Sequence, residues 1–225
     1  MKKLGIFCAG LVLVLAAPVA MAANIVDDPG FEAGAFGGVW TEFSATFGTP
    51  LCDIGSCGTG GGTGPASGDW WAWFGGIAAP EIGSVSQSLV IPVGANTLEF
   101  QFENSASDTV ADFIEARIDG IGVWTYFADG SIPVYALQSV DISAFADGAV
   151  HTLEFYSEIS AVGGGGSNFF VDDVVIDDGV IPAGRGACCD GDACSIETEA
   201  DCIAAGGAYQ GDNTECFANS GMEMD

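Results

Sequence analysis

Strict alternation of apolar and polar side chains marks the middle of the chain. Every second residue is apolar over residues 98–103, and residues 114–118 repeat the pattern. Because successive side chains of a β-strand point to opposite faces, each run predicts a strand with one buried face and one face in water. Asp119-Gly120 follows the second run, and both positions tolerate the positive φ that a tight hairpin requires. We therefore expect residues 121–127 to return as the partner strand.

Similar strand signals recur on both sides of this hairpin. We expect further strands near residues 85–91, 134–142, 151–157 and 168–176, with Pro92 ending the first of them. No run has the convincing period of an amphipathic helix of normal length. About nine short strands, separated by Gly, Asp and Pro, predict an all-β fold, namely an antiparallel β-sandwich.

The start of the chain has a different pattern. Lys2 and Lys3 precede an apolar run, and Ala20-Met21-Ala22 offers a small-x-small cleavage site. We interpret residues 1–22 as a secretory signal peptide. No later apolar run approaches the length of a membrane span, so we expect the remainder to be a secreted, extracellular or cell-surface protein.

The strand pattern stops before the end of the chain. Residues 179–186 contain Pro182 and three glycines, which is typical of a linker. A cysteine-rich segment follows over residues 187–225. The sequence therefore predicts a main domain over residues 23–178 and a small disulfide-rich C-terminal appendage.

Acidic residues dominate the charge. The chain has 31 Asp and Glu against four Lys and Arg, for a formal net charge of −27. Such a field repels phosphate backbones and anionic lipid, which excludes nucleic acid and anionic membrane surfaces as expected partners. It is compatible with divalent cations and neutral glycans, although for most of these carboxylates the acidity serves solubility alone.

One carboxylate stands out because of its apolar neighbours. Period 2 places Phe170, Val174 and Ile176 on the same strand face as Asp172. Burial of an unpaired charge is costly, so Asp172 needs a cation, a cluster of N–H donors, or water at a strand end. Calcium is the leading candidate, because basic residues are scarce and calcium prefers oxygen ligands. The alternative is that Asp172 accepts backbone N–H groups while Glu32 caps a turn.

Two terminal segments resemble a known family. Residues 28–34, Asp-Pro-Gly-Phe-Glu-Ala-Gly, and residues 170–174, Phe-Val-Asp-Asp-Val, resemble the first and last segments of galactose-binding-like jelly-roll domains. That family includes the calcium-containing carbohydrate-binding modules of secreted bacterial proteins. The blocks at residues 73–76, 83–87, 118–120, 141–148 and 151–155 resemble a subgroup found in exported bacterial proteins. The resemblance covers residues 24–178 and implies a jelly roll.

The resemblance also implies a structural calcium between the first segment and the last strand. By position, Glu32 and Asp172 would supply carboxylates. Gly30 or Asp28 would add a further oxygen, and Asp173 another. Pro29 departs from the Asn or Gly that is usual at its position.

Aromatic residues follow a glycine-rich stretch in the first half of the chain. Cys52 and Cys57 are expected to form a disulfide just before it. Alternation places Trp71 and Trp73 on one strand face and Trp70 on the other. We expect Trp73 in the core, Trp70 as the exposed candidate for stacking on a sugar ring, and Trp71 in either place. Tyr126 and Tyr135 are weaker ligand candidates.

The tail carries the other cysteines of the expected mature chain. Its Gly-Ala-Cys-Cys opening resembles a small repeat found near the ends of exported proteins from environmental bacteria. We expect disulfides here, with zinc as the rival interpretation. Removal of Cys8 with the signal peptide leaves an odd number of cysteines, which predicts a free thiol, a disulfide-linked oligomer or a truncated repeat. The tail cysteines are Cys188, Cys189, Cys194, Cys202 and Cys216.

Catalytic motifs are scarce. His151 is the single histidine, and it shares strand parity with Leu153 and Phe155, which favours a structural role. The sequence has no Gly-x-Ser-x-Gly elbow and no His-Glu-x-x-His helix, although a pair of carboxylates could still serve a glycosidase. We therefore predict a noncatalytic, calcium-stabilised secreted module that binds glycan or a surface polymer. The alternative is a structural protein of the cell surface or extracellular matrix with no glycan ligand.

Overall fold

The structure is a computed structural model that describes residues 23–160, 162–179, 185–190, 193–211 and 214. The predicted signal peptide, most of the predicted linker and Cys216 lie outside these residues. The chain divides into two compact units, with the boundary between Val180 and Ile181. No helix in the described ranges is long and apolar enough to cross a membrane.

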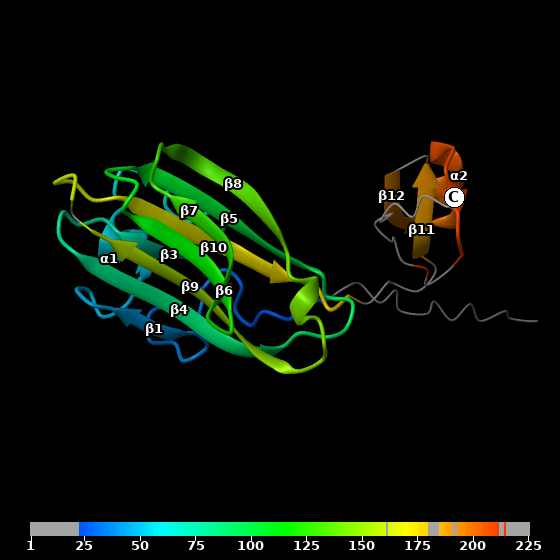
Figure 1. Ribbon diagram of the computed structural model, residues 1–225, viewed down its shortest axis with the longest axis horizontal. Helices are drawn as coiled ribbons and strands as arrows, with labels where there is room; N and C mark the ends of the chain where they lie inside the picture. The colour runs from blue at the N-terminus through cyan, green and yellow to red at the C-terminus, as the bar shows by residue number, and fades with distance from the viewer. Residues whose placement is uncertain (1–22, 161, 180–184, 191–192, 212–213, 215–225) are drawn as a thin grey trace, which may run out of the picture. The chain divides into compact units, whose positions relative to one another are not determined.

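The first unit consists of two five-stranded antiparallel sheets (Figure 1). One sheet has the order β1 (Thr41–Ser44), β4 (Glu81–Val90), β9 (Val150–Ile159), β6 (Phe113–Ile118), β7 (Ile121–Phe127). The other has the order β2 (Leu51–Asp53), β3 (Trp70–Gly75), β10 (Asn168–Ile176), β5 (Thr97–Ala106), β8 (Ile132–Asp141). The predicted antiparallel β-sandwich is confirmed.

The core lies between the two sheets and follows the predicted alternation. Phe100 and Phe102 of β5 are fully buried, and Phe100 packs edge-on against Phe155 of β9 with ring centroids 5.0 Å apart. The hairpin between β6 and β7 is also as predicted, since Asp119 and Gly120 have φ of 53° and 77°. Positive φ at both positions is the signature of a type I′ turn, which suits the twist of the strands.

The last strand of the sandwich departs from simple alternation. Phe169 and Val171 face the main core, whereas Phe170 belongs to a smaller cluster with Cys52 and Trp71 on the opposite face of the sheet. The pairing of β10 with β5 shifts between Asp172 and Val175, and Asp173 has a φ of 50°. This bulge returns Val174 and Ile176 to the main core.

The prediction that Asp172 shares a face with Val174 and Ile176 was therefore wrong. Of these three predicted neighbours, only Phe170 lies on the outer face with Asp172. The extra residue at the bulge inverts the alternation, so Val174 and Ile176 point to the main core.

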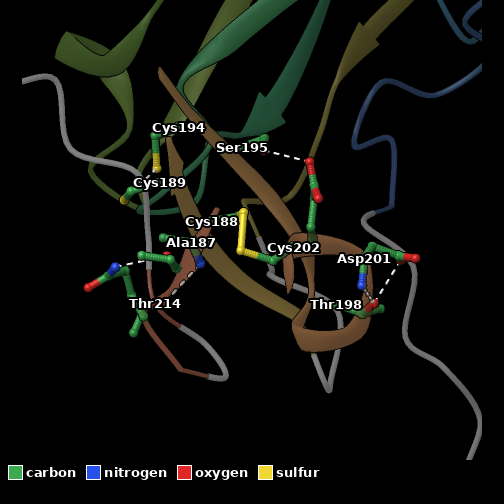
Figure 2. The surroundings of a disulfide bond; sticks show 12 residues. Ala187, Cys188, Cys189, Cys194, Ser195, Thr198, Asp201, Cys202 and Thr214 are labelled. Atoms are coloured by element: carbon green, nitrogen blue, oxygen red, sulfur yellow. Dashed lines mark hydrogen bonds between the residues drawn. A yellow bond between two sulfur atoms is a disulfide. The ribbon is translucent and has the colours of Figure 1, made fainter. Parts of the chain in front are cut away.

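The second unit is a small sheet with one helix (Figure 2). β11 (Arg185–Asp190) lies between β12 (Ala193–Thr198) and β13 (Ala208–Tyr209). Helix α2 (Glu199–Ala205) begins after Thr198, whose hydroxyl accepts a hydrogen bond from the Asp201 N–H at 3.1 Å. A disulfide between Cys188 and Cys202 fastens this helix to β11. Cys189 on the same strand is a free, half-buried thiol. Because β11 begins at Arg185, the last two residues of the predicted linker belong to a strand.

Candidate functional site

A pocket of about 430 Å³ opens beside the end of strand β3. That volume is in the range of small-ligand sites. The described residues that line it are all uncharged, and they include two indoles, one phenyl ring and two hydroxyls. They are Ala35, Phe47, Thr49, Leu51, Cys52, Ser56, Cys57, Trp70, Trp73, Gly75 and Gly76.

One wall of the pocket is a short helix held by a disulfide. Helix α1 (Ile54–Cys57) follows directly after β2, and the Asp53 carboxylate caps it by accepting from the Ser56 N–H at 3.0 Å. The predicted disulfide between Cys52 and Cys57 is present. The two cysteines have a sequence separation of only 5, so the disulfide restricts the unfolded chain little. Its main effect is to fix the shape of this wall.

The tryptophans of β3 divide between the faces of the sheet as alternation requires. Trp71 and Trp73 lie on the outer face with ring centroids 6.4 Å apart, and Trp70 packs partly against the main core. Trp71 has no exposed surface, so its ring is not available to a ligand. Trp70 and Trp73 are both half-buried and both line the pocket. Trp73 is thus a candidate ligand residue that the sequence analysis assigned to the core.

Close contacts with glycine fix the Trp73 ring. A Cβ at Gly60 would overlap the indole, and a Cβ at Gly76 would lie 2.8 Å from its Cζ2 atom. Trp73 Nε1 donates to Asn168 Oδ1 at 3.0 Å, and Asn168 Nδ2 donates to the Gly60 carbonyl at 3.0 Å. The ring is therefore pre-organised before any ligand arrives, which lowers the entropic cost of binding.

The glycine-rich loop, residues 58–69, covers this outer face of the sheet. Carboxylates from three separate segments hold it by accepting its N–H groups. The hydrogen bonds are Thr63 N to Glu103 at 3.1 Å, Ala66 N and Ser67 N to Asp172 at 2.7 and 3.2 Å, and Asp69 N to Glu32 at 2.9 Å. The Thr63 hydroxyl also donates to Glu103. Glu103 and Asp172 are fully buried beneath the loop.

The structure brings together the two carboxylates expected to bind calcium. A Cβ placed on Gly30 would lie 3.7 Å from Asp172 Oδ1 and 3.8 Å from Glu32 Oε1. The remaining two carboxylates of the expected set have other partners. Asp28 accepts from the Ala33 N–H at 3.1 Å, and Asp173 accepts from the Ser67 hydroxyl at 2.6 Å.

The backbone hydrogen bonds of Asp172 match the alternative stated above, whereas Glu32 accepts from the distant N–H groups of Asp69 and Trp70 and caps no turn of its own segment. Asp172 also accepts from the Asp173 N–H at 2.8 Å, and Glu32 also accepts from the Trp70 N–H at 3.1 Å. Within the described ranges, no group of three or more His, Cys, Asp or Glu side chains is placed to hold a metal ion. Any cation at this point would need backbone and water oxygens to complete its shell.

Burial dominates the electrostatics beneath the loop. Desolvation raises the pKa of Asp172 to about 7, although its N–H donors oppose the shift. Burial also raises the pKa of Tyr135, with the charges of Asp172 and Glu103 as secondary causes. The Tyr135 hydroxyl donates to the Gly64 carbonyl at 2.8 Å, so this residue, a weak ligand candidate from sequence, fastens the loop.

His151 lies between two carboxylates that the sequence did not show to be its neighbours. Its Nδ1 lies 2.7 Å from Asp119 and its Nε2 lies 3.0 Å from Asp147. The hydrogen bond with Asp119 is the main cause that raises the pKa of His151, followed by the bond with Asp147. Both ring nitrogens of His151 thus have carboxylate partners. The bond with Asp119 joins the β6–β7 turn to β9, which is a structural role.

Tyr126 lies away from the tryptophan pocket. Its ring packs against Phe102 with centroids 4.9 Å apart, and its hydroxyl donates to the Gly130 carbonyl. Tyr126 is half-buried and packs against the main core. It is not among the described residues that line the pocket.

No family model matches the chain, and no curated protein matches it. Solved structures with low sequence identity are similar to it in part. A family 61 carbohydrate-binding module in complex with β-1,4-galactotriose is 16% identical, with a TM-score of 0.49 over 68% of this chain and 97% of that one. A family 11 carbohydrate-binding module of a Clostridium thermocellum cellulosomal cellulase is 14% identical, with a TM-score of 0.32 over 72% of this chain and 96% of that one. A cyclase from Fischerella sp. is 13% identical, with a TM-score of 0.39 over 68% of this chain and 96% of that one.

Proposed function

We propose that this protein is a secreted, noncatalytic module that binds a neutral glycan or surface polymer in the pocket that Trp70 and Trp73 line. The observation that carries the proposal is the pair of half-buried indoles lining one uncharged pocket, one of them held in place by glycine contacts. The disulfides Cys52–Cys57 and Cys188–Cys202 are compatible with export to an oxidising compartment.

The chemistry of the lining suits a sugar ring better than a charged ligand. Aromatic faces bury the apolar C–H faces of a pyranose. The hydroxyls of Thr49 and Ser56 already donate to Glu42 and Asp53, so each can only accept a hydrogen bond from a sugar hydroxyl. The net charge of −27 opposes an anionic polysaccharide. A neutral polymer avoids this repulsion.

A glycan array followed by calorimetric titration of the best neutral hit tests this proposal. Trp73→Ala and Trp70→Ala should each weaken binding by about tenfold or more, because buried aromatic anchors dominate such interfaces. Phe127→Ala is the matched control, since Phe127 is an exposed aromatic residue that does not line the pocket. It should bind like the wild type.

Two results would contradict the proposal. The first is unchanged binding by both tryptophan variants. The second is an intact protein that binds no glycan and forms disulfide-linked oligomers, which would favour the structural alternative.

We also propose a structural calcium between the N-terminal segment and strand β10. Support comes from the convergence of Glu32 Oε1 and Asp172 Oδ1 beside Gly30, in segments that are far apart in sequence. When bound, calcium would supply positive charge to two carboxylates that otherwise rely on N–H donors. About six to eight oxygens are required, so Glu32 and Asp172 would be joined by backbone carbonyls and water.

Thermal unfolding in calcium and in a chelator tests the calcium proposal. Saturating calcium should raise the melting temperature by about 5–10 °C, as expected for a ligand that binds only the folded state. Glu32→Gln should remove most of this shift. Glu103→Gln is the matched control, because Glu103 holds the same loop from another strand and should keep the calcium response. A full response in Glu32→Gln would refute the assignment.

A further inference from the structure

The turn over residues 45–48 carries the third aromatic ring of the pocket lining. Phe47 is 57% exposed and lines the pocket together with the two indoles. The turn follows β1, the outermost strand of its sheet. Ser44, the last residue of β1, fastens the turn, because its hydroxyl accepts a hydrogen bond from the Phe47 N–H at 2.9 Å. Ser44 therefore helps to set where the phenyl ring stands.

A buried carboxylate on the neighbouring strand orients the Ser44 hydroxyl. Glu81 begins β4 and points into the sandwich on the same face as Val85, because alternate residues of a strand share a face. The Ser44 hydroxyl donates to Glu81 Oε1 at 2.5 Å. With its proton committed to Glu81, the hydroxyl presents its lone pairs to the Phe47 N–H. A relay thus runs from Glu81 through Ser44 to Phe47.

Glu81 has no other hydrogen bond in the described part of the chain. Its exposed fraction is 4%, and its second oxygen, Oε2, is buried without a hydrogen-bond partner among the described residues. Burial of a carboxylate with so few partners is costly, and an apolar residue of similar volume often serves stability equally well or better. Residues that break such a rule are expected where function requires them.

A second relay of the same kind holds the next part of this wall. The Thr49 hydroxyl donates to Glu42 and accepts from the Leu51 N–H at 2.9 Å. Thr49 and Leu51 also line the pocket. Glu42 additionally accepts from the Phe36 N–H at 2.7 Å, which offsets its burial, whereas the described hydrogen bonding of Glu81 goes to the relay alone.

We propose that Glu81 is a positioning residue of the pocket, which holds the Phe47 ring in place through Ser44. The inference rests on the proposed function, and it assigns Phe47 the third apolar surface against the C–H faces of a sugar. Glu81 is not among the described residues that line the pocket, so it acts on affinity through the turn.

Two replacements of Glu81 in the intact protein test this inference by calorimetric titration with the best neutral glycan and by thermal unfolding. Glu81→Met removes the acceptor and keeps a similar volume. It should weaken binding by about threefold to tenfold while its melting temperature equals or exceeds that of the wild type. Glu81→Gln keeps an oxygen that accepts from Ser44, so its affinity should lie within about twofold of the wild type.

Gln87→Met is the matched control on the same strand and the same face. Gln87 is buried and exchanges two hydrogen bonds of 3.0 Å with the backbone of Asp27, away from the pocket lining. This variant should lose stability and keep its affinity. A variant that combines Glu81→Met with Phe47→Ala should bind like Phe47→Ala alone, because the effect of Glu81 passes through that ring.

Amide hydrogen exchange at Phe47, followed by NMR, tests the relay without any ligand. Exchange in Glu81→Met should be faster by about fivefold or more, whereas Glu81→Gln should resemble the wild type. Ser44→Ala, which cuts the relay at its middle, should reproduce the faster exchange and the weaker binding. If the wild type binds no glycan, the proposed function fails, and the exchange at Phe47 still decides the relay.

Wild-type exchange at Phe47 in both Glu81→Met and Ser44→Ala would overturn the inference. So would a Glu81→Met protein that binds glycan as tightly as the wild type.

Discussion

Replacing Asp172 by alanine should lower the free energy of unfolding of the β-sandwich by about 3–5 kcal/mol. The carboxylate is fully buried and accepts the N–H groups of Ala66, Ser67 and Asp173. Without it those donors lose their acceptor beneath the loop, and each buried unpaired donor costs about 1–3 kcal/mol. Urea unfolding in a chelator measures the effect. A loss below about 1 kcal/mol would show that water replaces the carboxylate.

Asp172→Asn is the matched variant, because it keeps the shape and one acceptor oxygen but cannot titrate. Burial raises the pKa of Asp172 from 3.8 to about 7, so the folded state binds this proton more tightly than the unfolded state. The resulting stabilisation is complete below about pH 4 and is lost as pH rises through about 7. In a chelator, the wild type should therefore lose more stability over this range than Asp172→Asn. Equal losses would contradict the assignment.

Trp71→Ala should lower the free energy of unfolding by about 3–5 kcal/mol, as expected for truncation of a fully buried aromatic residue. The indole packs edge-on against Phe170 with centroids 5.9 Å apart, so its removal leaves a cavity in the small outer cluster. Urea unfolding monitored by circular dichroism checks the loss of stability.

Trp71→Phe separates a structural role for this ring from a role in binding. The indole N–H of Trp71 has no hydrogen-bond partner in the structure, so phenylalanine loses volume but no hydrogen bond. We expect a cost of about 1–2 kcal/mol and unchanged glycan affinity. Trp71→Phe with native stability but weakened binding would instead make Trp71 a ligand residue.

The sequence was most informative where structure is determined locally. Alternation over residues 98–103 predicted β5 with the correct core face, because Leu98, Phe100 and Phe102 all meet the core. The predicted water face was wrong at Glu103, which is fully buried beneath the glycine-rich loop. Asp119-Gly120 predicted its turn because few residue pairs tolerate two positive φ angles. Cys52 and Cys57 are close enough in sequence for their pairing to be read directly.

The sequence was least informative where contacts join distant segments. The bulge at Asp173 leaves no mark on the alternation of residues 168–176, so the face of Val174 could not be assigned. Ala66 and Asp172 are 106 residues apart, and nothing local predicts that a glycine-rich loop buries the outer face of β3. For the same reason the sequence could not show that Trp71 is buried in a second, smaller apolar cluster, or that Trp73 lines the pocket.

The fastening of the glycine-rich loop has a consequence for how the pocket moves. Residues 58–69 are bound to the sandwich through carboxylate and amide hydrogen bonds and through the packing of Gly60 and Gly62 on Trp73 and Phe170, whereas the two sheets are held by a separate apolar core. Segments with few apolar contacts open at lower free energy than the core around them. Release of Gly60 would remove one of the contacts on the Trp73 ring, which also packs against Trp71 and Phe170. We therefore expect the loop beside the pocket to open locally at a lower free energy than global unfolding.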